Sequence, residues 1–275
     1  RPGRGVGRPQ AQKGEDRAQE EARAVKASPP RLRDADGAKV GAAELQRAVV
    51  AACLAQILPN ATEIAAGGEA PELVHQLRVG IRRLRSALRE LESVAPGRFD
   101  TPAWEPVLVE AFRTLGAQRD RDVLQARLQP RLEAAGAPPI ELPQADDARQ
   151  LPSPGELVRS AAFQKVLVAL IGFAAPPQDA APAAGDEAAA VRKTVAQRLD
   201  KLHRQLRKAG KRFEKLPAHE QHRARKRLKR LRYLAEFVAP LFDKDKAHRY
   251  VERLLPVQDA LGDYNDDVVA IDVYR

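Results

Sequence analysis

The sequence predicts an all-α protein, and three observations lead to this prediction. Ala and Leu are abundant, whereas aromatic residues make up only 4% of the 275 residues and runs of β-branched residues are scarce. Apolar residues amount to 44%, which is enough for a sizeable core. They recur with helical spacing in the segments that prolines and glycines separate, and two of these segments resemble each other.

The two similar segments are strongly basic. The first begins at His75 and the second at His222, and each has an arginine three residues later and a base-Arg-Leu-Arg sequence seven to ten residues later. At 3.6 residues per turn, the bases fall on one stripe of a helix and the apolar residues fall on the opposite face. The stripes consist of His75, Arg78, Arg82, Arg85 and Arg89 in the first segment and of His222, Arg225, Lys229 and Arg232 in the second.

Residues 1–40 are rich in Gly, Pro, Arg and Ala and lack an apolar stripe, so we expect a flexible linker or tail there. A helical domain is predicted over 41–275. Its first-half helices are predicted over 43–58, 72–93, 101–116 and 120–135, where Pro59, Pro96-Gly97 and Gly116 supply stops and Thr101 and Asp120 supply caps.

Two loops rich in Pro and Ala, over 136–155 and 175–185, flank the middle of the chain. The remaining helices are predicted over 156–174, 187–215, 217–240, 245–261 and from 265 onward. Leu115-Gly116 and Leu261-Gly262 are each followed by an aspartate four residues after the glycine. Together with the basic segments, this indicates an internal repeat covering about 41–136 and 187–275, with two similar helical bundles facing each other across the basic stripes.

The net charge of +10 is unevenly distributed. Residues 192–233 hold 17 Lys and Arg against three acids, while the chain outside the two basic regions is net acidic. Successive like charges on one helix face repel, and for the three pairs formed by Arg78, Arg82, Arg85 and Arg89 this costs about 1 kcal/mol when nothing is bound. A solvated basic face is the simplest interpretation of one such helix, but two in matching register favour a polyanionic partner.

No catalytic motif is present, and we expect a non-catalytic protein without cofactor or metal. The sequence lacks both common glycine-rich phosphate loops, and His219-Glu220-Gln221-His222 has the second histidine one position early for a zinc protease helix. The arginines around His75 and His222 would repel a cation, so we expect these histidines to donate hydrogen bonds to an anion. Four aspartates could bind a divalent ion, although capping and ion pairing are the favoured roles: Asp120, Asp122, Asp266 and Asp267.

The repeated pattern His-x-x-Arg-x-x-x-[Arg/Lys]-Arg-Leu-Arg, followed in each half by Leu-Gly-x-x-x-Asp, resembles the CHAD family, the conserved-histidine α-helical domain. The resemblance covers about 40–275 and implies two pseudo-symmetric four-helix bundles packed together with a central basic groove or pore. It also implies binding of inorganic polyphosphate without catalysis. Beyond the two stripes, the candidate polyphosphate-binding residues are Arg83, Arg204, Arg207, Lys208, Lys211 and Arg230.

Two other functions stay open. Nucleic-acid binding is compatible with the charge, but single-strand binders add aromatic stacking platforms, and only Tyr233 lies on the repeated basic helices. A basic amphipathic scaffold at a granule or membrane surface would require the leucine faces to be exposed.

The composition also bears on location. Cys53 is the only cysteine, so no disulfide forms within the chain, and the cytoplasm is the expected compartment, with polyphosphate granules as a place of association. No apolar stretch is expected to span a membrane. We expect the chain to be part of a longer protein, because it contains no Met and because Val25–Pro30 is similar to the linker that follows a CYTH domain. The resemblance to the CHAD family also implies a last helix that extends beyond Arg275.

Overall fold

The computed structural model describes residues 23–32, 39–134, 136, 151–177 and 183–274. Within these ranges the chain forms eight α-helices, two short 3-10 helices and no strand, which confirms the all-α prediction. The α-helices are α2 Ala42–Ala65, α3 Pro71–Leu91, α4 Thr101–Ala134, α5 Pro154–Arg159, α6 Ala161–Ala174, α7 Gly185–Gly210, α8 Ala218–Val238 and α9 Lys244–Tyr274. The 3-10 helices are η2 Phe213–Lys215 and η3 Ala239–Leu241.

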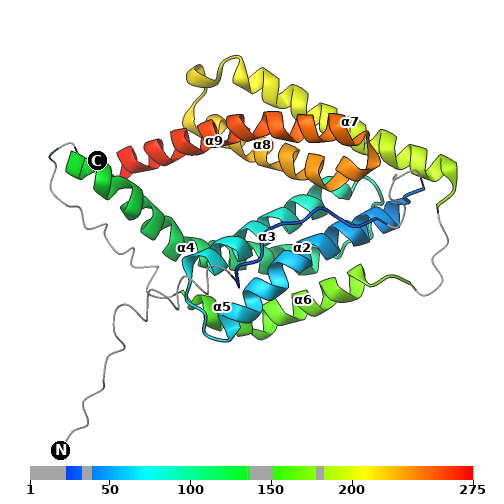
Figure 1. Ribbon diagram of the computed structural model, residues 1–275, viewed down its shortest axis with the longest axis horizontal. Helices are drawn as coiled ribbons and strands as arrows, with labels where there is room; N and C mark the ends of the chain where they lie inside the picture. Colours follow the sequence, from blue (N-terminus) through cyan, green and yellow to red (C-terminus); the bar gives the residue numbers. More distant parts are fainter. Residues whose placement is uncertain (1–22, 33–38, 135, 137–150, 178–182, 275) are drawn as a thin grey trace, which may run out of the picture.

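Helices α2, α3, α4 and α6 form a four-helix bundle. α2 packs against α3 and α6, and α4 packs against the same two helices, so that the four surround one core (Figure 1). Leu45, Ile57, Leu77, Leu84 and Leu108 are fully buried in this core. The short helix α5 covers the side of α2 near α6.

The second half contains three long helices in its described residues. α8 packs against α7, α9 and α3, so it connects the two halves (Figure 1). The predicted second bundle of four helices is therefore represented by α7, α8 and α9, and the pseudo-two-fold relation between the halves stays a prediction.

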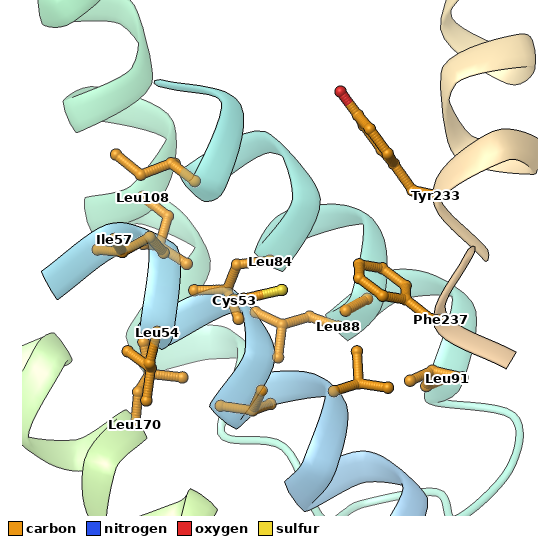
Figure 2. Close-up of a cluster of buried hydrophobic side chains, with 14 of the residues drawn as sticks. Cys53, Leu54, Ile57, Leu84, Leu88, Leu91, Leu108, Leu170, Tyr233 and Phe237 are labelled. Carbon is orange, nitrogen blue, oxygen red and sulfur yellow. The ribbon is translucent and has the colours of Figure 1, made fainter. Parts of the chain in front are cut away.

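The contact between α3 and α8 has an apolar base. Figure 2 shows Phe237 of α8 pointing toward Leu88 and Leu91 of α3, with Cys53 of α2 nearby. Phe237 and Leu91 are fully buried, and Tyr233, one turn before Phe237, is 3% exposed. Burial of two aromatic side chains and the leucines, at about 25 cal/mol per Å² of apolar area, holds α8 against the first bundle.

Two predicted helix ends in the first half are wrong because packing overrides local sequence. α2 continues through Pro59 to Ala65, since Ala61 and Ile64 are buried in its last two turns and Asn60 Nδ2 donates to the carbonyl oxygen of Gln56 at 2.6 Å. α4 runs through Gly116 without a break, and this buried glycine allows a close approach of α3.

Other predicted boundaries also shift. The helix predicted over 156–174 is two helices, because Ser160 is extended and its hydroxyl accepts a hydrogen bond from the Phe163 amide at 3.3 Å as the cap of α6. α7 ends at Gly210 rather than 215. The two helices predicted on either side of Gly262 are one helix, α9, with Pro256 inside it.

Part of the predicted tail is held against the domain. Val25 forms two backbone hydrogen bonds with the side chain of Asn60, at 3.1 Å and 2.9 Å, and Pro30 is buried. The segment 23–32 thus lies along the first bundle, and the other residues of the predicted tail up to 38 lie outside the described ranges.

One helix within the described residues has the length and apolar composition of a membrane span. It is α2, with a mean hydropathy of 1.4 over its most apolar window. In the structure its apolar side chains are mostly buried against α3 and α6, as in the central helix of a bundle.

Candidate functional site

The basic stripe of α3 is positioned by the burial of the opposite face of the same helix. Leu77, Ile81 and Leu84 are fully buried in the first bundle. The amphipathic pattern therefore turns the stripe toward α4 and α8, the other two helices that α3 contacts beside α2. Arg82 is partly buried and makes no ion pair within the described part of the chain.

The stripe of α8 is positioned in the same way. Leu228 and Leu231 are fully buried, and Ala224 is buried one turn earlier. Lys229 and Arg232 are partly buried on the side of α8 that approaches α3 and α9.

The two stripes meet at their centres. The pKa of Lys229 is lowered from 10.5 to about 7, first by burial and then by the positive charges of Arg82, from α3, and Arg225. Arg232 acts in the same direction, whereas the carboxylate of Asp266 on α9 opposes the shift. We call Arg82, Arg225, Lys229 and Arg232 the central basic cluster. Four bases of two helices that are far apart in the sequence lie near one another here, with Asp266 acting on Lys229 and Glu236 ion-paired with Arg232.

Phe112 of α4 supports the α3 side of this cluster. The guanidinium groups of Arg78 and Arg82 each lie 4.9 Å from the centre of its ring, within cation–π distance. Arg78 is 5% exposed and donates a hydrogen bond to the carbonyl oxygen of Leu115 at 3.3 Å. A Cβ at Gly116 would lie 3.0 Å from a guanidinium nitrogen of Arg78, so the glycine of the Leu-Gly motif makes room for this arginine.

Arg83 and Arg230, both predicted as ligands, are engaged by acids of the opposite helix. Arg83 of α3 is ion-paired with Glu236 of α8, and its guanidinium lies 4.8 Å from the ring centre of Phe237. Arg230 of α8 is ion-paired with Glu90 of α3, which is 1% exposed and also accepts from Arg198 of α7 at 2.6 Å. These side chains hold α3 and α8 together in one register.

Sequence reasoning missed Glu90 and Glu236. Glu90 lies two helical turns after Arg83, on the same side of α3, and Glu236 lies one turn after Arg232, with which it is also ion-paired. The sequence did contain a signal for these two residues, because each is an acid in an otherwise basic segment and lies off the main stripe.

The outer end of the α3 stripe is partly neutralised. Arg85 donates to Glu105 of α4 through two nitrogens, at 3.0 Å and 2.7 Å, and the exposed Arg89 lies 4.0 Å from the same carboxylate. On α8, Arg232 is shared between Glu236 and Gln258, the latter at 2.7 Å. Within the described part of the chain Arg82 makes no ion pair, and three neighbouring bases act on Lys229 against the single opposing charge of Asp266.

Four predicted bases, three on α7 and one directly after it, are exposed, and no hydrogen bond or ion pair within the described residues joins them to the central basic cluster. They lie on the side of the helix away from the buried Leu202, which faces the core. These residues are Arg204, Arg207, Lys208 and Lys211.

The two histidines differ in their surroundings. His75 is partly buried on α3, whereas His222 is exposed at the start of α8. The pKa of His222 is lowered by desolvation and then by the charge of Lys226, and a hydrogen bond with Asn265 opposes this. His222 is therefore neutral at pH 7 in the absence of an anion.

The four aspartates considered for a divalent ion are partly accounted for. Asp266 acts electrostatically on Lys229, in line with the ion-pairing role. The side chains of Asp120 and Asp122 lie outside the described residues. Among the residues that are described, no group of three His, Cys, Asp or Glu side chains could hold a metal ion.

Fold and site together define a class: an all-α domain in which two helical halves meet through paired basic helices. The sequence model of the CHAD domain matches residues 48–275, and this chain belongs to that family. The structure is similar to the crystal structure of the CHAD domain from the plant Ricinus communis, with a TM-score of 0.67 and 28% sequence identity over 89% of this chain and 80% of that one. No curated protein matches the sequence.

Proposed function

We propose that this CHAD domain binds inorganic polyphosphate at the central basic cluster, as a non-catalytic module. The observation that carries the proposal is the meeting of Arg82 and Lys229, the middle residues of the two stripes, which come from separate halves of the chain. A chain of phosphate groups passing between α3 and α8 would offset the repulsion between these bases on both sides at once.

The shape of the basic surface fits a linear polymer. The α3 stripe from His75 to Arg89 extends about 21 Å at 1.5 Å per residue, which is several times the length of one phosphate group. Arginine can hold two phosphate oxygens through its planar fork, and lysine adds a compact charge. The ion pairs of Arg83 and Arg230 fix the spacing of the two stripes before the anion binds.

The surroundings favour polyphosphate over single-stranded nucleic acid. Stacking of bases requires accessible aromatic rings. Tyr233 is 3% exposed and its ring lies between Arg83 and Arg232, at 5.5 Å and 4.7 Å from their guanidinium carbons, while Phe112 is partly buried beneath Arg82. Insertion of α3 or α8 into a membrane surface is disfavoured because their leucine faces are buried in the core.

The test is a titration with polyphosphate of defined chain length at several salt concentrations. We expect tight binding at low salt that weakens steeply as salt rises, because counterions are released. Competition with single-stranded RNA at equal phosphate concentration distinguishes the partners. Displacement of polyphosphate by RNA would show that nucleic acid is the preferred ligand, and absence of polyphosphate binding at low salt would refute the proposal.

A further inference from the structure

A second basic surface lies on α9, away from the central basic cluster. A depression of about 300 Å³ is lined by Lys246, Arg249, Tyr250 and Arg253, and we call it the α9 depression. Lys246, Arg249 and Arg253 follow one another at intervals of three and four residues, so they share one face of the helix. None of the three makes an ion pair within the described part of the chain.

The floor of the α9 depression is fixed by a contact with α7. The Tyr250 hydroxyl lies 2.9 Å from Nδ1 of His203, and the two rings are 5.9 Å apart, centre to centre. Burial and the neighbouring carboxylate of Asp200 raise the pKa of Tyr250 to about 12, so the hydroxyl keeps its proton. The partly buried tyrosine therefore forms a rigid, uncharged surface beside exposed basic side chains.

Two acids of this helix segment have other partners, and neither Asp245 of α9 nor Asp200 of α7 is among the residues that line the depression. Glu252 is ion-paired with His248, at 3.1 Å, and Asp243 caps the start of α9 by accepting from the Lys246 amide at 2.9 Å. The bases of the α9 depression thus repel one another without a carboxylate among the lining residues.

The α9 depression is separate from the central basic cluster. Asp266, the α9 residue that acts on Lys229, lies sixteen residues after Tyr250, which is about 24 Å along the helix. At about 100° per residue the two side chains also lie on nearly opposite sides of α9. One short anion therefore cannot contact both Tyr250 and Lys229, although Arg232 of the central basic cluster donates to Gln258, which lies five residues after Arg253.

From these observations we propose that the α9 depression is a second binding site, for a short anion built of phosphate groups. Two arginines and a lysine on one face can each contact different oxygens of a di- or triphosphate group, and the volume is at the lower end of the range for ligand sites. A triphosphate group satisfies more of these donors than a single carboxylate, which brings one charge. The inference is independent of the function proposed for the central basic cluster.

The experiment uses tripolyphosphate as the probe and calorimetry as the measurement. The variant Arg82→Gln/Lys229→Gln serves as the background, because it weakens the central basic cluster and leaves the α9 depression unchanged. Adding Arg249→Gln/Arg253→Gln should lower the remaining affinity at least tenfold. Adding Lys165→Gln/Lys193→Gln, which removes the same charge from exposed positions on α6 and α7, should change it less than twofold.

An equal effect of the two added pairs, or no effect of the first, would overturn the second site. This result is distinct from a failure of the central basic cluster, which would appear as unchanged polyphosphate binding in the background variant alone. Titration of the same variants with long-chain polyphosphate then shows whether the α9 depression binds free short anions or a segment of a long chain. If Arg249→Gln/Arg253→Gln also weakens its binding, the α9 depression takes a segment of the long chain, and if only tripolyphosphate is affected, it takes free short anions.

Discussion

Glu90 of α3 is ion-paired with Arg230 of α8 although the two residues are 140 positions apart, and the carboxylate is almost completely buried. Arg83 and Glu236 form the reverse pair, with the arginine on α3 and the acid on α8. Both pairs join α3 to α8, the two helices that carry the bases that we propose as the site, so the same contact between the halves positions these bases.

The first prediction concerns this contact. Glu90→Gln leaves Arg198 and Arg230 without their shared carboxylate in a buried place, and we expect the free energy of unfolding to fall by about 3 kcal/mol. Urea denaturation followed by circular dichroism measures this. Glu220→Gln, which breaks the exposed pair with Arg223, is the control and should change stability by less than about 1 kcal/mol. Similar losses in both variants would contradict the role assigned to Glu90.

The second prediction concerns the glycine of the Leu-Gly motif. Gly116→Ala places a methyl group against the guanidinium of Arg78 and should destabilise the domain by about 1 kcal/mol. Gly172→Ala in α6 meets no atom within 4 Å and should stabilise it by about 0.5–1 kcal/mol, because alanine is the better helix former. Thermal unfolding of the two variants side by side provides the measurement. Equal shifts would show that Gly116 is not needed to accommodate Arg78.

The third prediction concerns the pH dependence of stability. Because the pKa of Lys229 is about 7 in the folded chain and near 10.5 in the unfolded chain, the unfolded state binds more protons between these values. The folded state should therefore gain stability as pH rises from 7 toward 10. Denaturation at several pH values tests this. Lys229→Met should remove the contribution of this lysine to the slope of the free energy of unfolding against pH. An unchanged slope would contradict the lowered pKa of Lys229.

The fourth prediction concerns the protonation of Lys229 when polyphosphate binds. A polyanion favours the protonated lysine, so binding at pH 8 should be accompanied by proton uptake, and affinity should decline as pH rises above 7. Calorimetry in buffers of different ionisation enthalpy measures the protons. Lys229→Arg keeps the charge and should abolish the uptake at pH 8. His222→Gln should leave uptake at pH 8 intact, since the pKa of His222 is lowered below its usual 6.5.

Much of the placement of the two basic stripes was predictable from the sequence, because a helical period determines which residues share a face. Arg82 and Leu84 lie on opposite faces of α3, and Lys229 and Leu231 lie on opposite faces of α8. Both placements follow from the sequence spacing alone. Repetition of the pattern then indicates that the two faces belong to one function.

The partners of the arginines were not predictable in this way. Arg83 and Arg230 look like additional ligands in the sequence, since their acids lie on another helix and only the packing of α3 against α8 brings them together. The helix ends expected at Pro59 and Gly116 were wrong for a related reason. The intrinsic cost of a proline or glycine inside a helix is at most about 3 kcal/mol. The free energy gained by burying the side chains of the following turn can exceed this cost.

The most direct test of the account is the affinity of Arg82→Ala/Lys229→Ala for long-chain polyphosphate at physiological salt, compared with the unaltered chain. We expect at least a tenfold loss, with stability equal or slightly higher, because two repelling charges are removed from the contact between the halves. Arg82→Glu/Lys229→Glu should abolish binding altogether. If both variants bind polyphosphate as tightly as the unaltered chain, the meeting of the two stripes is not the binding site.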